Sequence, residues 1–337
     1  MKNELCGKDI LITGGTGSIG SEIVRQILNY EVNKVIIFSK DELRHLSIKK
    51  RIPDDRLEAF VGDVRDYNSI RRIFEQENID IVYHAAAMKH VIVCEKFPIE
   101  SVKTNIIGTQ NLVDLARAYE VPKMITISTD KSACPVNVMG STKFIAERIT
   151  LNSNYSCVRF GNVANSRGSV IPIFIQSLIN KTPIEITDPD VTRFIISISD
   201  AANLVLKATK YSNGGEIFIL KMKAFKLGDL LDVVIDRIAP ILNIREGDVI
   251  VNRTSLALGE KLHEDLVNFT ELGRLYELDD MYLILENIDF NANNTSFYEK
   301  LTKSEITKYT SNEVELLSKD ELEIIIRDYL NTSTSLV

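Results

Sequence analysis

Short apolar runs alternate with longer segments of mixed polarity along the first half of the chain. Each run has four to six residues, which is the length of a buried strand. The runs lie at residues 8–13, 34–38, 57–61, 79–84, 124–127 and 155–160. The segments between them are predicted to be helices, for example at 21–30 and 98–119. Strands and helices that alternate in this way form a parallel sheet with helices on both faces, so we expect a doubly wound α/β fold.

The pattern loosens after residue 165, where glycines, prolines and shorter apolar runs become frequent. Helices are expected near 199–210 and 227–238, and a charged helix near 318–329. No period of 20 to 50 residues repeats, so a solenoid is excluded. We therefore predict a large domain at 1–165, completed by segments around 190–220, a discontinuous and smaller mixed α/β lobe mainly at 166–285, and a polar segment with a helix at 286–337.

A glycine-rich turn follows the first predicted strand directly. Gly14, Gly17 and Gly20 stand between that strand and a helix, with Thr16, Ser18 and Ile19 among them. Glycine lets the backbone turn tightly and approach a ligand, while the unpaired N–H groups and the dipole of the helix favour a pyrophosphate. A glycine triplet alone also fits an ordinary turn, but its place between strand and helix predicts a Rossmann-type nucleotide site.

The end of the second strand bears on the choice between NADP and NAD. Ser39 and Lys40 come first after this strand, and a hydroxyl with a cation suits the 2′-phosphate of NADP. An acidic residue at the same point would instead bind the free ribose hydroxyl of NAD. Asp41 follows, and its alternative interpretation is the N-cap of the next helix. We expect NADP, with NAD as the less favoured cofactor.

Further residues at strand ends are candidates for contact with the nucleotide. Asp63, next to Val64, could meet the adenine amine. Three alanines after the fourth strand leave room for a nucleotide to lie flat against the backbone. The histidines beside them, at 84 and 90, are interpreted mainly as satisfied histidines at a strand end. The full set of these candidates is Asp63, Val64, Ala85, Ala86, Ala87 and, on the helix at 98–119, Asn105.

Residues 128–143 gather reactive side chains at the carboxyl end of the fifth strand. Thr129, Asp130 and Lys131 emerge together there, where open α/β sheets bind their ligands. After a proline the chain restarts as a helix, with Met139 and Lys143 at i and i+4 on one face. The alternative interpretation is a strand, loop and helix with solvated charges.

Composition narrows the classes of function that remain. The net charge of −7 argues against a nucleic-acid surface, which would carry clustered Lys and Arg. The four cysteines have no metal-ligand spacing with the four histidines, so no metal is expected. No segment approaches the roughly 20 apolar residues of a membrane span, and the first residues lack the apolar run of a signal peptide. We expect a cytoplasmic protein.

Taken together, these motifs resemble those of an extended short-chain dehydrogenase/reductase. More narrowly, the chain resembles the bacterial UDP-N-acetylglucosamine 4,6-dehydratases of surface-polysaccharide and flagellin-glycan synthesis. The resemblance covers about residues 8–330, and its last motif is Tyr-Thr-Ser-Asn. The motifs that carry it lie at 14–20, 39–42, 62–64, 85–89, 128–131, 159–163, 168–172, 192–194, 259–264 and 309–312.

The resemblance implies a reaction in which NADP takes a hydride from C4 of the sugar, water leaves across C5 and C6, and the hydride returns to C6. Asp130 is the expected acid at C6. Lys131 is the expected base at C5, provided that its amine is neutral. Lys143 would hold the nicotinamide ribose. Met139 occupies the position of the family's tyrosine, so the C4 hydroxyl proton must leave through Asp130, Thr129 or a water.

The resemblance also implies contacts to UDP-N-acetylhexosamine. Lys89 is expected at the sugar, and the UDP side draws on the motifs at 162–193 and 259–264. The family usually has Arg-Pro before Gly-Glu-Lys, whereas this chain has Ala-Leu, which leaves open the arginine that holds the diphosphate. Each candidate has an alternative as a surface charge or loop cap. The UDP-side candidates are Asn162, Gly168, Ser169, Val170, Arg193, Glu260 and, for the diphosphate, Arg253.

Two other functions stay open at this point. One is a UDP-sugar 4-epimerase on the same scaffold, against which the Thr-Asp-Lys motif argues because an epimerase needs no acid–base pair for C5 and C6. The other is a non-catalytic NADP-binding sensor that has lost its tyrosine. The methionine resembles family members that retain the C5 configuration, so retention is expected, and we expect a homo-oligomer, a dimer or higher.

Overall fold

A ten-stranded sheet forms the centre of the protein. The computed structural model describes residues 1–166, 168–286, 295–298 and 301–333. The strand order in the sheet is β16-β14-β15-β10-β6-β5-β4-β1-β2-β3. The strands are β1 (Asp9–Thr13), β2 (Lys34–Ser39), β3 (Leu57–Val61), β4 (Ile81–His84), β5 (Lys123–Ile127), β6 (Ser156–Arg159), β10 (Glu216–Leu220), β14 (Leu275–Leu278), β15 (Met281–Leu285) and β16 (Thr302–Lys303).

The parallel part of the sheet runs from β3 to β10, and β15, β14 and β16 extend it in antiparallel pairing. The predicted parallel sheet is confirmed, and each predicted strand lies within two residues of its observed bounds. The antiparallel strands β14 and β15 also belong to this sheet, although they fall in the region predicted mainly as the smaller lobe.

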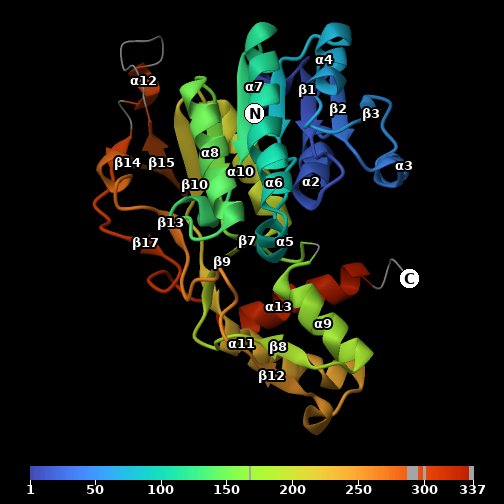
Figure 1. Ribbon diagram of the computed structural model, residues 1–337, viewed down its shortest axis with the longest axis vertical. Coiled ribbons are helices and arrows are strands. Elements are labelled where there is room, and N and C mark those ends of the chain that lie inside the picture. Colours follow the sequence, from blue (N-terminus) through green and yellow to red (C-terminus); the bar gives the residue numbers. More distant parts are fainter. Residues whose placement is uncertain (167, 287–294, 299–300, 334–337) are drawn as a thin grey trace.

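Alternate residues of the strands face two different helix layers. On β1, Ile10 and Ile12 pack with helices α2 (Ser18–Ile27) and α10 (Ile198–Tyr211), and Leu11 packs with α4 (Tyr67–Gln76) and α7 (Gly108–Ala118). Figure 1 shows α7 and α8 (Val138–Asn152) in front of the sheet and α10 behind it. In central strands such as β1, β4 and β6, apolar residues on both faces are therefore buried, which is why these strands read as continuous apolar runs.

The remaining helices of this part are short or interrupted. The helix predicted at 98–119 consists of α6 (Pro98–Ser101), a π-helical segment at Val102–Ile107 and α7. The first predicted helix begins one turn early, at Ser18, because Gly17 is its N-cap. The other helices are α1 (Lys2–Leu5), α3 (Glu42–Arg51) and α5 (Val91–Lys96), with a 3₁₀ turn at Asp130–Ser132.

A second, smaller lobe lies below the sheet in Figure 1 and has its own apolar core. Ile171, Phe174 and Leu178 of α9 pack there with Leu230 of α11 and Leu322 of α13. Its elements are α9 (Val170–Asn180), β8 (Ile184–Ile186), α11 (Leu227–Val233) continued by a π-helical segment at Val234–Ile238, β12 (Val251–Arg253) and α13 (Lys319–Ser333), with 3₁₀ turns at Pro240–Leu242 and Glu246–Asp248. The predicted helices near 199–210, 227–238 and 318–329 are confirmed.

Small sheets join the two lobes. Strand β7 (Asn162–Val163) follows β6 and pairs with β9 (Thr192–Ile196), which pairs with β11 (Ala224–Lys226). Strand β13 (Asp265–Val267) pairs with β17 (Tyr309–Thr310), so the last motif of the chain returns to this junction. A 3₁₀ turn at Leu272–Arg274 and α12 (Thr295–Tyr298) complete the elements. Of the polar segment and helix predicted at 286–337, positions 287–294, 299–300 and 334–337 lie outside the described residues.

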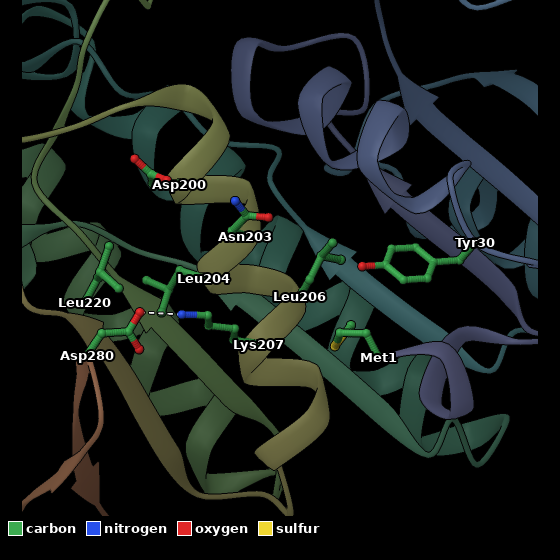
Figure 2. A pocket seen from close by; sticks show the side chains of 9 residues that line it. All are labelled: Met1, Tyr30, Asp200, Asn203, Leu204, Leu206, Lys207, Leu220 and Asp280. Atoms are coloured by element: carbon green, nitrogen blue, oxygen red, sulfur yellow. Dashed lines mark hydrogen bonds and ion pairs between the residues drawn. The ribbon is translucent and has the colours of Figure 1, made fainter.

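A hollow lies beside α10, the helix behind the sheet in Figure 1, and Figure 2 shows it from close by. Asp200, Asn203 and Lys207 of α10 line it, and Lys207 forms an ion pair with Asp280. The hollow contains none of the candidate site residues. Within the described part of the chain, no helix has the length and apolar character that crossing a membrane requires.

Candidate active site

The glycine turn forms a cradle at the carboxyl end of β1. Gly14 has a φ of +68°, and a Cβ atom there would lie 2.7 Å from the backbone nitrogen of Ala86. A Cβ atom on Gly20 would lie 2.3 Å from the carbonyl oxygen of Gly14. Gly17 caps α2 without any side-chain hydrogen bond, so the first N–H groups of the helix stay available to an anion. These features fit a dinucleotide pyrophosphate.

Gly20→Ala is expected to weaken dinucleotide binding about tenfold or more, because the added methyl group must displace backbone rather than a flexible side chain. Binding of NADPH followed by fluorescence measures the effect. Gly247→Ala is the matched control, since a Cβ atom there meets nothing within 4 Å. Equal affinities in the two variants would show that the turn does not hold the nucleotide.

The tip of β2 carries a chain of hydrogen bonds. The Ser39 hydroxyl lies 2.9 Å from the Thr16 hydroxyl and 2.8 Å from Nε2 of His45. Asp41 caps α3 by accepting a hydrogen bond of 3.1 Å from the backbone N–H of Arg44, so its interpretation as a helix cap is confirmed. Lys40 is exposed at this tip. The tip of β2 thus carries an exposed cation beside a hydroxyl that is bonded to Thr16 and His45.

At the end of β3, Asp63 forms a forked ion pair with Arg65, with Oδ2 at 2.7 Å and 3.0 Å from two guanidinium nitrogens. Burial opposes ionisation of Asp63, but the hydrogen bonds from Arg65 outweigh it and lower its pKa. Val64 is buried against Gly108, where a Cβ atom would lie 2.7 Å from a Val64 methyl carbon. Asp63 is thus a fixed, charged acceptor at the end of β3.

Asn105 holds the loop that contains the three alanines. Its Oδ1 accepts a hydrogen bond of 2.8 Å from the N–H of Met88, and its Nδ2 donates to the Met88 carbonyl at 3.0 Å. Nδ2 also lies 3.0 Å from the Thr142 hydroxyl on α8. Ala85 and Ala86 meanwhile close over Gly14. Asn105 lies on the π-helical segment at Val102–Ile107, a departure from α-helix geometry, and its buried side-chain amide bonds to the loop at Met88.

His84 is a satisfied core histidine, as interpreted from the sequence. Its ring nitrogens lie 2.7 Å from the Thr13 hydroxyl and 3.0 Å from the Thr109 hydroxyl. Burial, together with the charge of Lys143, lowers the pKa of His84 to about 3, so the ring is neutral.

Two carboxylates and one ammonium meet after β5. Oδ1 of Asp130 accepts hydrogen bonds from the Thr129 hydroxyl at 2.7 Å and from Nζ of Lys131 at 3.1 Å. Nζ of Lys131 also lies 3.3 Å from Oε1 of Glu264, which comes from the loop before β13. The Asp130 side chain is 0% exposed and that of Glu264 is 3% exposed. We call these residues, Asp130, Lys131 and Glu264, the acid–lysine cluster.

The cluster determines the protonation of Lys131. Burial alone would lower its pKa, but the charges of Asp130 and Glu264 outweigh burial and Arg193, so the pKa of Lys131 is raised. Lys131 is thus held as an ammonium. The condition under which it would serve as the base at C5, a neutral amine, is not met in this arrangement.

Glu264 is the member of the cluster that the sequence interpretation missed. It ends the motif at 259–264, from which only Glu260 was selected. The available signal was a second carboxylate in a motif specific to this branch of enzymes. Its backbone N–H donates to the Ser311 hydroxyl at 2.9 Å, so the Tyr-Thr-Ser-Asn motif near the end of the chain positions it.

Met139 and Lys143 lie on one buried face of α8, as predicted. Asn137 caps this helix by accepting a hydrogen bond of 2.7 Å from the N–H of Gly140. Met139 is 4% exposed. Nζ of Lys143 donates to the Ile127 carbonyl at 2.5 Å, at the end of β5. Burial lowers the pKa of Lys143, and the nearby Glu147 opposes that shift.

Arg159, Glu147 and Glu271 form a buried ionic layer that contacts the turn after Asp130. Arg159 is 0% exposed, and its guanidinium lies 2.8 Å from Glu147 and 2.9 Å from Glu271. The Ser132 hydroxyl donates to Glu147 at 2.6 Å, which ties the turn after Asp130 to this layer. Each of these two glutamates has both carboxylate oxygens bonded. The layer is therefore structural rather than open to a ligand.

The predicted UDP-side residues differ in their surroundings. Asn162 Oδ1 and the Ser169 hydroxyl are buried and have no hydrogen-bond partner within the described residues. Gly168 has a φ of +73° and lies against the ring of His90. Val170 begins α9 directly after Ser169, which is its N-cap.

The charged candidates are placed in three ways. Arg193 and Glu260 pair with each other at 2.9 Å, and Arg193 also donates to the carbonyls of Lys261 and Leu262. The pair shapes the loop before Glu264. Arg253 is exposed on β12 of the second lobe, and Lys89 is exposed in the loop after β4.

The doubly wound sheet, the glycine cradle, the acid–lysine cluster and Lys143 on α8 together define an extended short-chain dehydrogenase/reductase. The chain belongs to the polysaccharide biosynthesis protein family, whose sequence pattern matches residues 10–286.

Relatives of known sequence cover most of the chain. It is 44% identical over 316 residues to an uncharacterized membrane protein of Methanocaldococcus jannaschii, covering 89% of this chain and 94% of that protein. It is 37% identical to the UDP-N-acetylglucosamine 4,6-dehydratase (inverting) of Campylobacter jejuni, covering 86% of each chain. A UDP-glucose 4-epimerase of Rickettsia bellii is 35% identical, with 84% and 85% covered.

Solved structures agree with the fold. The chain is 34% identical to Pen from Bacillus thuringiensis, with a TM-score of 0.87 over 97% of this chain and 99% of that one. DesIV, a dTDP-glucose 4,6-dehydratase from Streptomyces venezuelae, has a TM-score of 0.71 at 18% identity, covering 96% and 97% of the chains. The second likeness shows the fold alone.

Proposed function

We propose that this protein is a UDP-N-acetylglucosamine 4,6-dehydratase of surface-glycan synthesis. Its product is a UDP-2-acetamido-2,6-dideoxy-4-hexulose. The observation that carries the proposal is the acid–lysine cluster, which stands at the carboxyl end of β5 in the same sheet edge as the glycine cradle. Loss of water across C5 and C6 needs a proton donor and a proton acceptor close together, and this cluster supplies carboxylates for both.

NADP is the proposed cofactor, because the cradle fits a dinucleotide and Ser39 and Lys40 stand at the tip of β2. Bound there, oxidised NADP would accept the hydride from C4 of the sugar and return it to C6. Lys143, whose ammonium group lies at the end of β5, would hold the nicotinamide ribose and favour loss of the C4 hydroxyl proton. The Met139 thioether exchanges no proton, so that proton passes to Asp130, directly or through the Thr129 hydroxyl.

Lys40→Ala is expected to lower the affinity for NADP about tenfold and to leave the affinity for NAD unchanged. The reason is that a charge-assisted contact to the 2′-phosphate is lost, and NAD has no such phosphate. Calorimetric titration with each dinucleotide measures both affinities. Lys50→Ala, which removes an exposed lysine in the last turn of α3, is the control. A parallel loss for NAD and NADP would contradict the assignment.

Incubation of the purified protein with UDP-N-acetylglucosamine and NADP tests the proposed reaction. A 4,6-dehydratase gives a product lighter by one water, whereas a 4-epimerase preserves the mass. The epimerase is the second candidate, since several relatives carry that name. A protein that binds NADP but converts neither UDP-N-acetylglucosamine nor another UDP-sugar is a sensor, and the proposal is then wrong.

Retention of configuration at C5 is part of the proposal and follows from the resemblance at Met139. The Campylobacter jejuni relative is named an inverting enzyme, so the point needs its own measurement. An NMR spectrum of the product formed in deuterated water gives the C5 configuration through its ring couplings. It also shows whether the C5 proton comes from solvent.

We also propose that the protein assembles as a homo-oligomer. Ile92, Phe97, Ile99 and Ile107, on consecutive helical segments from α5 to the π-helical segment, are large apolar side chains with exposed fractions of 46–73%. Exposed apolar side chains gathered on neighbouring turns are typical of an interface between subunits. Light scattering of the purified protein measures the mass.

A further inference from the structure

The carboxylates of the acid–lysine cluster are each used only in part. Oδ1 of Asp130 accepts from the Thr129 hydroxyl, from the backbone N–H of Lys131 and from Nζ of Lys131. Oδ2 of Asp130 and Oε2 of Glu264 are buried and have no hydrogen-bond partner among the residues that the structure describes. An unbonded buried carboxylate oxygen costs free energy, so it is expected where a ligand completes the bonding.

Glu264 differs in this respect from the buried glutamates of the ionic layer. Both oxygens of Glu147 and both oxygens of Glu271 receive hydrogen bonds from Arg159 or its neighbours. Glu264 offers one oxygen to Lys131 at 3.3 Å and leaves the other unbonded. Its carboxylate is therefore buried, but one of its oxygens makes no hydrogen bond within the described residues.

The backbone of Glu264 is braced from a distant part of the chain. Its N–H donates to the Ser311 hydroxyl and its carbonyl accepts from the Ser311 N–H, each at 2.9 Å. The Ser311 hydroxyl also lies 2.7 Å from the Thr192 hydroxyl on β9. Two backbone bonds therefore hold the residue, and its side chain is free to act on a substrate.

We propose that Glu264 is a catalytic residue that takes the proton from C5 of the sugar and gives it back, while Asp130 moves the C4 hydroxyl proton to the leaving C6 hydroxyl. Lys131 stays protonated between them. This proposal rests on the proposed function and deepens it. It starts from the state that the structure shows, with one ammonium shared by two carboxylates.

The atoms balance over one cycle. The O4–H bond breaks and Asp130 takes the proton as the C4 hydride leaves to the bound cofactor. The C5–H bond then breaks toward Glu264, its electron pair forms the double bond to C6, and the C6–O bond breaks as Asp130 gives up its proton to form water. The hydride returns to C6, and Glu264 returns its proton to C5. Both carboxylates end as they began.

The electrostatic surroundings agree with these roles. Glu264 faces Lys131, Asp130, Arg193 and Lys261, and burial with the negative charge of Asp130 raises its pKa despite the cations. A base must be deprotonated, so the C5 step is lost as the pH falls through this raised pKa. A single carboxylate that removes and returns the proton acts on one face of C5, which also gives retained configuration.

Glu264→Gln tests the proposal, because the amide keeps the size and the backbone contacts but cannot accept the proton. Water elimination from UDP-N-acetylglucosamine is expected to fall about 10²-fold or more. Oxidation at C4 continues, so the absorbance of reduced nicotinamide accumulates when the variant is mixed with substrate. Glu264→Asp should restore part of the elimination. Glu313→Gln, an exposed glutamate paired with Lys308, is the matched control.

A second readout needs neither substrate nor cofactor. The infrared difference between wild type and Glu264→Gln should show one carboxyl group that protonates above the ordinary range of glutamate. Glu264→Gln that eliminates water within threefold of wild type would overturn the proposal, as would a variant that accumulates no reduced nicotinamide although it binds UDP and NADP normally. If wild type itself forms no dehydrated product, the proposed function fails instead, and the two failures are distinct.

Discussion

Asp130→Asn is expected to lower the rate of water elimination from UDP-N-acetylglucosamine about 10³-fold. Asp130 has the only carboxylate that is bonded to both the Thr129 hydroxyl and Lys131 in the described part of the chain. An amide can accept the same hydrogen bonds at Oδ1, but it can neither receive the C4 hydroxyl proton nor deliver one to the C6 hydroxyl. Mass spectrometry of the product, which is lighter by one water, gives the rate.

The same variant separates Asp130 from Glu264. Without Asp130 the C4 hydroxyl keeps its proton, so reduced nicotinamide should not accumulate, in contrast to Glu264→Gln. Asp232→Asn is the control, because Asp232 forms an exposed ion pair with Lys319 at 2.7 Å. The midpoint of urea unfolding checks that Asp130→Asn is folded. Dehydration at the wild-type rate would show that Asp130 is not the acid.

The fold was predictable because each strand carries its own signal. Residues 57–61 were predicted as a strand and form β3 with the same bounds. The central strands are buried on both faces, so each reads as an apolar run whatever strands lie beside it. Strands β14 and β15 were not predicted; β15 pairs with β10 and β14 pairs with β15, and only these pairings assign them to the large sheet. Local patterns do not contain that information.

The site was predictable where its residues lie in one segment. Asp130, Lys131 and Lys143 follow a single strand, and the structure brings them to one edge of the sheet. Glu264 was missed because its contact with Lys131 joins two segments far apart in the sequence. Arg193 and Glu260 were selected because the resemblance implies contacts to UDP, and the sequence could not show that they bond to each other.

Arg159→Met is expected to lower the free energy of unfolding by about 3–5 kcal/mol, which is the usual cost of removing one partner from a buried ion pair. Arg159 is 0% exposed and donates to both oxygens of Glu147 and both oxygens of Glu271. Methionine fills similar space, so the loss reports the removal of Arg159 from two buried carboxylates, of which Glu271 keeps Arg148 at 3.7 Å. Urea unfolding followed by circular dichroism measures the change.

Two further variants test whether charge or packing stabilises the ionic layer of Arg159, Glu147 and Glu271. Arg327→Met removes an exposed arginine that pairs with Glu323, and it should leave the unfolding midpoint unchanged within error. Arg159→Met combined with Glu147→Gln and Glu271→Gln should recover part of the lost stability, because no buried charge is then left without a partner. If the triple variant is less stable than Arg159→Met, packing of the guanidinium stem rather than its charge holds this layer. Glu147 also accepts a hydrogen bond from the Ser132 hydroxyl. That result would therefore show that side-chain packing, rather than charge, supports the turn after Asp130.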